Sequence, residues 1–118
     1  MKQIEERFNH QYKYPWTFLN DEPFTKEFIE QTAKWASGGV AHGLVPPAQW
    51  SVPDHIDKHH MQKALENMGK KKILYGDSLP YRHMCRFQSG FFWRHELVAK
   101  YDYYWRVEPD TGFFCDIE

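Results

Sequence analysis

Long apolar stretches are missing from this chain of 118 residues. No run approaches the roughly eighteen apolar residues that a transmembrane helix needs, so the sequence predicts no membrane span. Charge of one sign does not dominate either, because 15 Lys and Arg face 16 Asp and Glu, for a net charge of -1 with neutral histidines. This balance argues against a nucleic-acid partner or another polyanion. The length predicts one domain or part of one.

Cysteines are few, and the common phosphate-binding loops are absent. Cys85 and Cys115 could form one bridge, stay as buried thiols or pair outside the chain, and two cysteines cannot build a four-cysteine zinc site. Gly38 and Gly39 lack the Gly-x-Gly-x-x-Gly spacing, and there is no Walker loop. Aromatic residues, in contrast, make up 18% of the chain, which argues against disorder.

Hydrophobic spacing predicts strands that alternate with helices, and therefore an α/β fold. Residues 40–53 contain three prolines and are expected to form an irregular loop held by Trp50. Thr25 and Asp54 are the expected N-caps of two helices. Helical segments are expected at 4–12, from Thr25 to the Gly38-Gly39 pair, from Asp54 to Gly69 and, with a break at Ser89-Gly90, within 80–99. Strand-like or extended segments are expected at 14–19, 73–75, 103–107 and 113–117.

Two histidines have a spacing that can hold zinc. His55 and His59 form a His-x-x-x-His pair, which would lie on one face of the predicted helix. The alternative is a solvated helix surface, because Asp54, Asp57 and Lys58 surround the pair and no third ligand lies at a suggestive distance.

The segment 81–92 contains two arginines four residues apart. On a helix, Arg82 and Arg86 can both point at one anion such as a phosphate. In the alternative interpretation, the arginines pair with surface carboxylates while neighbours such as Met84 and Phe87 pack in a core.

Glu108 precedes Pro109 directly after the strand-like residues 103–107. Open α/β sheets place ligand-binding groups at the C-terminal ends of strands. A carboxylate there suits a hard divalent cation that is bridged to substrate phosphates. The alternative is a turn carboxylate that caps a backbone amide. Asp116, farther along, is expected to have a structural role.

Longer strings of residues carry a family resemblance that runs from about residue 4 to the end of the chain. These strings are Arg7–Asn9, Tyr12–Asp21, Pro23–Thr25, Trp50–Asp57, Tyr81–His95 (YRHMCRFQSGFFWRH), Tyr101–Pro109 (YDYYWRVEP) and Phe114–Ile117 (FCDI). Together they resemble the fungal α-1,2-mannosyltransferases of glycosyltransferase family 15. The resemblance implies a GT-A-type α/β sheet domain. Residues 1–118 would then be a partial catalytic domain that lacks the first strand and the C-terminal half.

The resemblance also implies a reaction. Family members transfer mannose from GDP-mannose to mannose-terminated N- or O-linked glycans with retention of configuration. They use a divalent cation, usually manganese, on the lumenal side of the Golgi membrane. The matching positions make Glu108 the metal ligand and Tyr81 the residue next to the reacting sugar carbon. Tyr75 is a weaker candidate for the substrate pocket, and Arg82 and Arg86 are further candidates for substrate contacts.

The same resemblance predicts that this chain is inactive by itself, as a fragment, a truncated gene model or a degenerate copy. The alternative function is that of a catalytically inactive remnant or interaction module of the same fold. If the enzymatic interpretation holds, Glu108 should lie at the end of a strand on a concave face, and Tyr81 should open onto the same cleft. Residues expected to be exposed by an incomplete sheet are Trp16, Phe18, Trp105 and Phe114.

Overall fold

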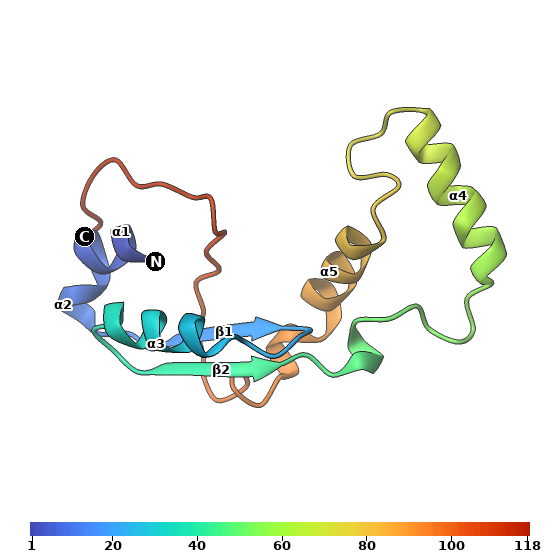
Figure 1. Ribbon diagram of the computed structural model, residues 1–118. Helices are drawn as coiled ribbons and strands as arrows, with labels where there is room; N and C mark the ends of the chain where they lie inside the picture. Colours follow the sequence, from blue (N-terminus) through green and yellow to red (C-terminus); the bar gives the residue numbers. More distant parts are fainter. The chain divides into compact units, whose positions relative to one another are not determined.

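The computed structural model describes residues 1–118 as two compact units, Met1–Leu44 with Glu96–Glu118, and Val45–His95. None of the helices combines the length and the apolar content that crossing a bilayer requires. The first unit (Figure 1) contains α1 (Lys2–Ile4), η1 (Glu5–Asn9), α2 (His10–Tyr12), β1 (Trp16–Asn20), α3 (Lys26–Trp35) and β2 (Val40–Leu44). The second contains η2 (Pro47–Gln49), α4 (Lys58–Lys70), α5 (Leu79–Gly90) and η3 (Phe92–Arg94).

The sheet consists of two parallel strands, β1 and β2, which run side by side in Figure 1. Trp16 lies opposite Val40, and α3 provides the crossover that a parallel pair requires. Thr25 caps α3, because its hydroxyl accepts a hydrogen bond from the backbone N–H of Phe28 at 3.1 Å. The predicted strand, helix and N-cap in this part of the chain are therefore confirmed.

Aromatic side chains hold α3 on the sheet. The Phe18 ring of β1 lies 5.3 Å from Phe28 of α3 and 5.5 Å from His42 of β2, measured between ring centroids. Phe24 approaches the same imidazole at 5.3 Å, and the hydroxyl of Thr32 lies 2.9 Å from its Nε2. These contacts join β1, α3 and β2 into one half-buried layer.

A buried carboxylate connects the N-terminal helical segment, residues 2–12, to this layer. Glu5 is only 5% exposed. Its oxygens accept hydrogen bonds from Asn9 Nδ2 at 2.8 Å, from the indole N–H of Trp16, and from the backbone N–H of Ser37 at 3.0 Å. Burial raises the pKa of Glu5, but the hydrogen bonds from Ser37, Asn9 and Trp16 outweigh burial, so the pKa lies below its ordinary value.

Replacing Glu5 with Gln should lower the free energy of unfolding by about 2 kcal/mol at neutral pH, because an amide N–H would then face one of the three donors. A carboxyl with a lowered pKa contributes stability that is present above its ordinary pKa and lost as pH falls through the folded-state pKa. Urea denaturation should therefore show a difference between wild type and E5Q that shrinks on acidification. The control is E6Q, which changes the exposed neighbouring carboxylate. A difference for E5Q that is independent of pH would contradict this role.

The connections around β2 and α4 differ from the sequence predictions. Residues 40–44 form β2, because the first proline of the predicted loop comes only at position 46 and leaves the preceding N–H groups free to pair. α4 is capped by Asp57, whose carboxylate accepts from the His60 N–H at 3.0 Å, so the prediction of Asp54 as the cap is wrong. His55 consequently precedes the helix and does not share a helical face with His59.

Three predicted strands are also wrong. Residues 73–75 form a turn, in which Tyr75 adopts a φ of 56° that is incompatible with a strand. Residues 103–107 and 113–117 are irregular, because the structure pairs only β1 with β2 and a strand needs a neighbour for its backbone groups. The predicted helix within 80–99 is confirmed as α5, which ends at Gly90.

Candidate functional site

Glu108 lies on an exposed turn of the first unit. The Thr111 N–H donates to the Glu108 carbonyl at 3.2 Å, which confirms the predicted turn. The preceding residues form no strand, so the prediction that Glu108 ends a strand is wrong. Its carboxylate, 60% exposed, forms an ion pair with Arg106. The side chain is therefore accessible and already next to a cationic group.

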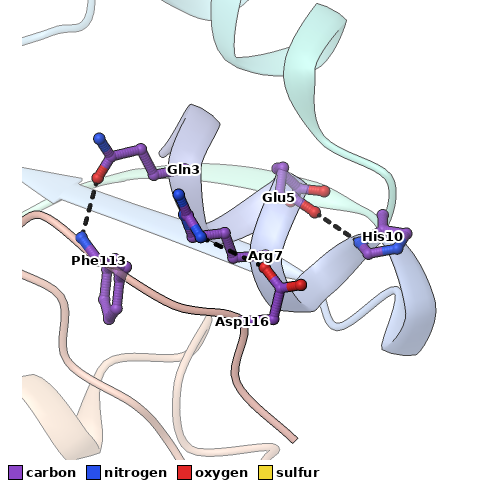
Figure 2. Close-up of polar contacts among 6 residues, drawn as sticks. All are labelled: Gln3, Glu5, Arg7, His10, Phe113 and Asp116. Carbon is purple, nitrogen blue, oxygen red and sulfur yellow. Dashed lines mark hydrogen bonds and ion pairs between the residues drawn. The ribbon is translucent and has the colours of Figure 1, made fainter.

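The residues that follow this turn run along the N-terminal helical segment (Figure 2). The Phe113 N–H donates to Gln3 Oε1 at 3.0 Å, and Arg7 Nη1 lies 3.4 Å from Asp116 Oδ1. The Ile117 N–H donates to the Arg7 carbonyl at 3.0 Å. Asp116 therefore contacts the helical segment through an exposed ion pair, and its structural role stays a prediction.

Tyr75 and Tyr81 are brought together in the second unit. Their rings stack with centroids 4.6 Å apart and planes 16° apart. Tyr81 lies in the first turn of α5, where its N–H donates to the hydroxyl of the N-cap Ser78 at 3.3 Å. Tyr75 precedes the helix in a left-handed conformation, and its carbonyl accepts from the Ser78 N–H at 3.2 Å. The turn and the helix cap therefore place the two exposed phenol rings face to face.

The two arginines of α5 donate hydrogen bonds to backbone carbonyls. Arg82 Nη2 donates to Gly76 O at 3.1 Å. Arg86 Nη1 donates to Ala48 O at 3.1 Å and lies 3.4 Å from Ser51 O. The two arginines therefore bind different backbone carbonyls. The structure shows neither the predicted pair aimed at one anion nor the alternative pair bonded to surface carboxylates. Substrate contact by either arginine stays a prediction.

Replacing Arg86 with Met should lower the free energy of unfolding by about 1 to 2 kcal/mol, because the loop carbonyls of Ala48 and Ser51 lose their donor. The matched control is R94M, since the guanidinium of Arg94 lies over the ring of its neighbour Trp93 on the exposed surface. Urea denaturation of both variants measures the difference. Equal losses in R86M and R94M would contradict a loop-holding role for Arg86.

The metal-binding capacity of the chain is limited. No group of three or more His, Cys, Asp or Glu side chains is arranged to hold a metal ion, so the zinc hypothesis for His55 and His59 gains no third ligand. Glu108 can contribute one oxygen, which fits a hard cation whose other ligands are water and phosphate oxygens. Tyr81 and Glu108 belong to different units, and their shared cleft stays a prediction. Both cysteines are free and exposed, namely Cys85 and Cys115.

The exposed aromatic residues follow the prediction in part. Phe114 is fully exposed, and Trp105 is 51% exposed. Trp16 and Phe18 are half-buried, because their rings stack on each other at 5.9 Å and Phe18 also packs against α3. The sheet residues Trp16 and Phe18 are thus partly shielded from solvent, whereas Trp105 and Phe114 of the C-terminal segment stay accessible.

Comparison with known proteins gives consistent matches along the whole chain. The family model described as glycolipid 2-alpha-mannosyltransferase matches residues 1–118. Alpha-1,2 mannosyltransferase KTR1 of Saccharomyces cerevisiae is 51% identical over 118 residues, which are 100% of this chain and 30% of that protein. O-glycoside alpha-1,2-mannosyltransferase omh1 of Schizosaccharomyces pombe is also 51% identical, with the same coverage. The chain therefore spans about 30% of the length of these relatives.

Solved structures give the same result for the fold. Core-mannan synthase A from Aspergillus fumigatus, in its Mn/GDP form, superimposes with a TM-score of 0.94 at 38% identity, over 99% of this chain and 32% of that one. Mannosyltransferase Ktr4p from S. cerevisiae, in complex with GDP, gives 0.92 at 40% identity, over 98% of this chain and 30% of that one. The predicted fold class, part of a GT-A-type α/β domain, is confirmed.

Proposed function

We propose that this chain, which belongs to the glycolipid 2-alpha-mannosyltransferase family, forms part of the catalytic domain of an α-1,2-mannosyltransferase. The reaction is transfer of mannose from GDP-mannose to mannose-terminated N- or O-linked glycans, with retention of configuration. The main support for this proposal is the family match over residues 1–118, together with 51% identity to α-1,2-mannosyltransferases. Because the chain spans about 30% of these relatives, the activity is proposed for the family's whole catalytic domain.

The proposed cofactor is a divalent cation, manganese, with Glu108 as one oxygen ligand. Support comes from the Mn/GDP form of the Aspergillus relative and from the exposed carboxylate of Glu108. When bound, such a cation neutralises the negative charge that develops on the departing GDP. Arg106 already forms an ion pair with this carboxylate, so its guanidinium has to move away when a cation binds Glu108.

Tyr81 is proposed to lie next to the reacting sugar. Its ring is fixed by the stack on Tyr75 and by the N-cap of α5, so its phenol group can keep one orientation toward a ligand. A neutral phenol is a weak nucleophile, and positioning of the sugar or stabilisation of its positive charge suits Tyr81 better. The proposed location, on the lumenal side of the Golgi membrane, rests on the family resemblance alone.

The test replaces the matching segment of the S. cerevisiae relative KTR1 with these 118 residues, to give a protein that we call the exchanged transferase. We expect manganese-dependent transfer of labelled mannose from GDP-mannose to α-methyl mannoside, and loss of transfer with a chelator. The 118-residue chain alone should give no transfer, because it spans about 30% of the relatives' length and catalysis needs several groups held in place together. A folded exchanged transferase without activity would favour the alternative, a catalytically inactive remnant.

A further inference from the structure

We propose that the N-terminal helical segment positions the turn of Glu108, and that Gln3 and Phe8 are the positioning residues. The proposal rests on the proposed function only for the role of Glu108 as a metal ligand. Neither Gln3 nor Phe8 needs to touch the metal or the nucleotide. Both act on the backbone that carries Glu108.

One end of the turn is held by aromatic contacts. The Trp105 ring meets Phe8 edge to face, with centroids 5.4 Å apart and planes 81° apart. The same indole meets Phe113 at 5.8 Å and 85°. Trp105 precedes Glu108 and Phe113 follows it, so the contact between these two rings brings the two ends of the turn together. The Phe8 ring then attaches Trp105 to the helical segment.

The other end is held by polar contacts to the same helical segment. Gln3 Oε1 accepts from the Phe113 N–H at 3.0 Å (Figure 2). Two further contacts, the Arg7–Asp116 ion pair and the hydrogen bond from Ile117 to the Arg7 carbonyl, continue this attachment. The ion pair is exposed and contributes little. The amide bond to Gln3 is therefore the better target.

The attachment matters because the contacts within the turn itself are local, namely the hydrogen bond from Thr111 to Glu108 and the exposed Arg106–Glu108 ion pair. No strand precedes the turn, and residues 108–112 are all exposed. A carboxylate on a free loop must lose conformational entropy each time it binds a cation, which weakens binding. An attached loop has already lost much of that freedom. Loosening the attachment should therefore raise the manganese concentration that is needed, while Glu108 itself is unchanged.

The test uses two variants with matched controls. Q3A removes the acceptor for Phe113, and F8L removes the ring that meets Trp105. Q11A removes a glutamine side chain from the same helical segment, and F24L removes a ring from the α3 layer of the same unit. Q3A is the cleaner variant, because the Phe8 ring also lies 4.7 Å from Tyr12.

The first measurement is amide hydrogen exchange of residues 108–113 in the metal-free 118-residue chain. We expect about tenfold faster exchange of the Thr111 and Phe113 amides in Q3A and F8L, and no change in Q11A and F24L. Unchanged exchange in both Q3A and F8L would overturn the proposal, whatever the function of the protein.

The second measurement is the manganese concentration for half-maximal transfer by the exchanged transferase. It should rise about tenfold in Q3A and F8L, with the maximal rate at saturating manganese nearly unchanged. A purely structural role would lower thermal stability and the maximal rate instead, and that result would overturn positioning. If the wild-type exchanged transferase shows no transfer, the proposed function fails, and the exchange rates alone decide whether the helical segment orders the turn.

Discussion

Replacing Glu108 with Gln in the exchanged transferase is expected to lower manganese-dependent transfer by about 100-fold or more. Glutamine keeps the size of the side chain and one oxygen, but it removes the negative charge that a hard cation requires. The loss should appear in the rate at saturating GDP-mannose, because the cation assists departure of GDP. Radiolabelled transfer assays of wild type and E108Q measure it.

The control for this prediction is E96Q, which changes another exposed carboxylate of the same unit. E96Q should retain the wild-type rate. If E108Q and E96Q have the same rate, Glu108 is not the metal ligand, although the family assignment would stand.

Replacing Gly38 with Ala is expected to lower the free energy of unfolding by about 3 kcal/mol. An added Cβ would lie 2.6 Å from the carbonyl oxygen of Tyr14 and closer still to that of Lys13. Both are backbone atoms, and Lys13 ends the N-terminal helical segment in a left-handed conformation with a φ of 56°. The neighbouring backbone is also fixed, because Ser37 bonds to Asn9 O at 2.9 Å. The clash cannot be relieved by rotating a side chain.

The adjacent glycine provides a matched control. A Cβ on Gly39 would meet only the Pro15 side chain, at an ordinary distance of 3.9 Å. In thermal or urea denaturation, G38A should therefore be less stable than G39A by most of the expected loss in the free energy of unfolding. Equal stability of the two variants would show that the close approach of residue 38 to the helix end is not a constraint.

Local signals made part of the fold predictable. β1 is a compact aromatic and β-branched run, and α3 has a threonine cap followed by helical spacing, so short-range chemistry determines both. β2 has no such signal, since it contains Gly43 and is ordered mainly by pairing with β1. Residues 103–107 have a strand-like composition, but they find no neighbouring strand to pair with. Strand formation depends on a partner that the local sequence does not reveal.

The candidate site was predictable only through family resemblance. Chemistry alone favoured the turn-capping role for Glu108, and it gave no reason to pair Tyr75 with Tyr81. The attachment of the Glu108 turn could not be predicted, because Gln3 and Phe113 lie 110 residues apart. The buried Glu5 was missed for the same reason, since its three donors lie on different elements of the fold.

The most direct test of the central claim is calorimetric titration of GDP into the exchanged transferase, with and without manganese, in wild type and E108Q. If Glu108 holds a cation that also binds the phosphates of GDP, manganese should tighten GDP binding about tenfold or more in wild type and hardly at all in E108Q. The same gain from manganese in both proteins would contradict the account.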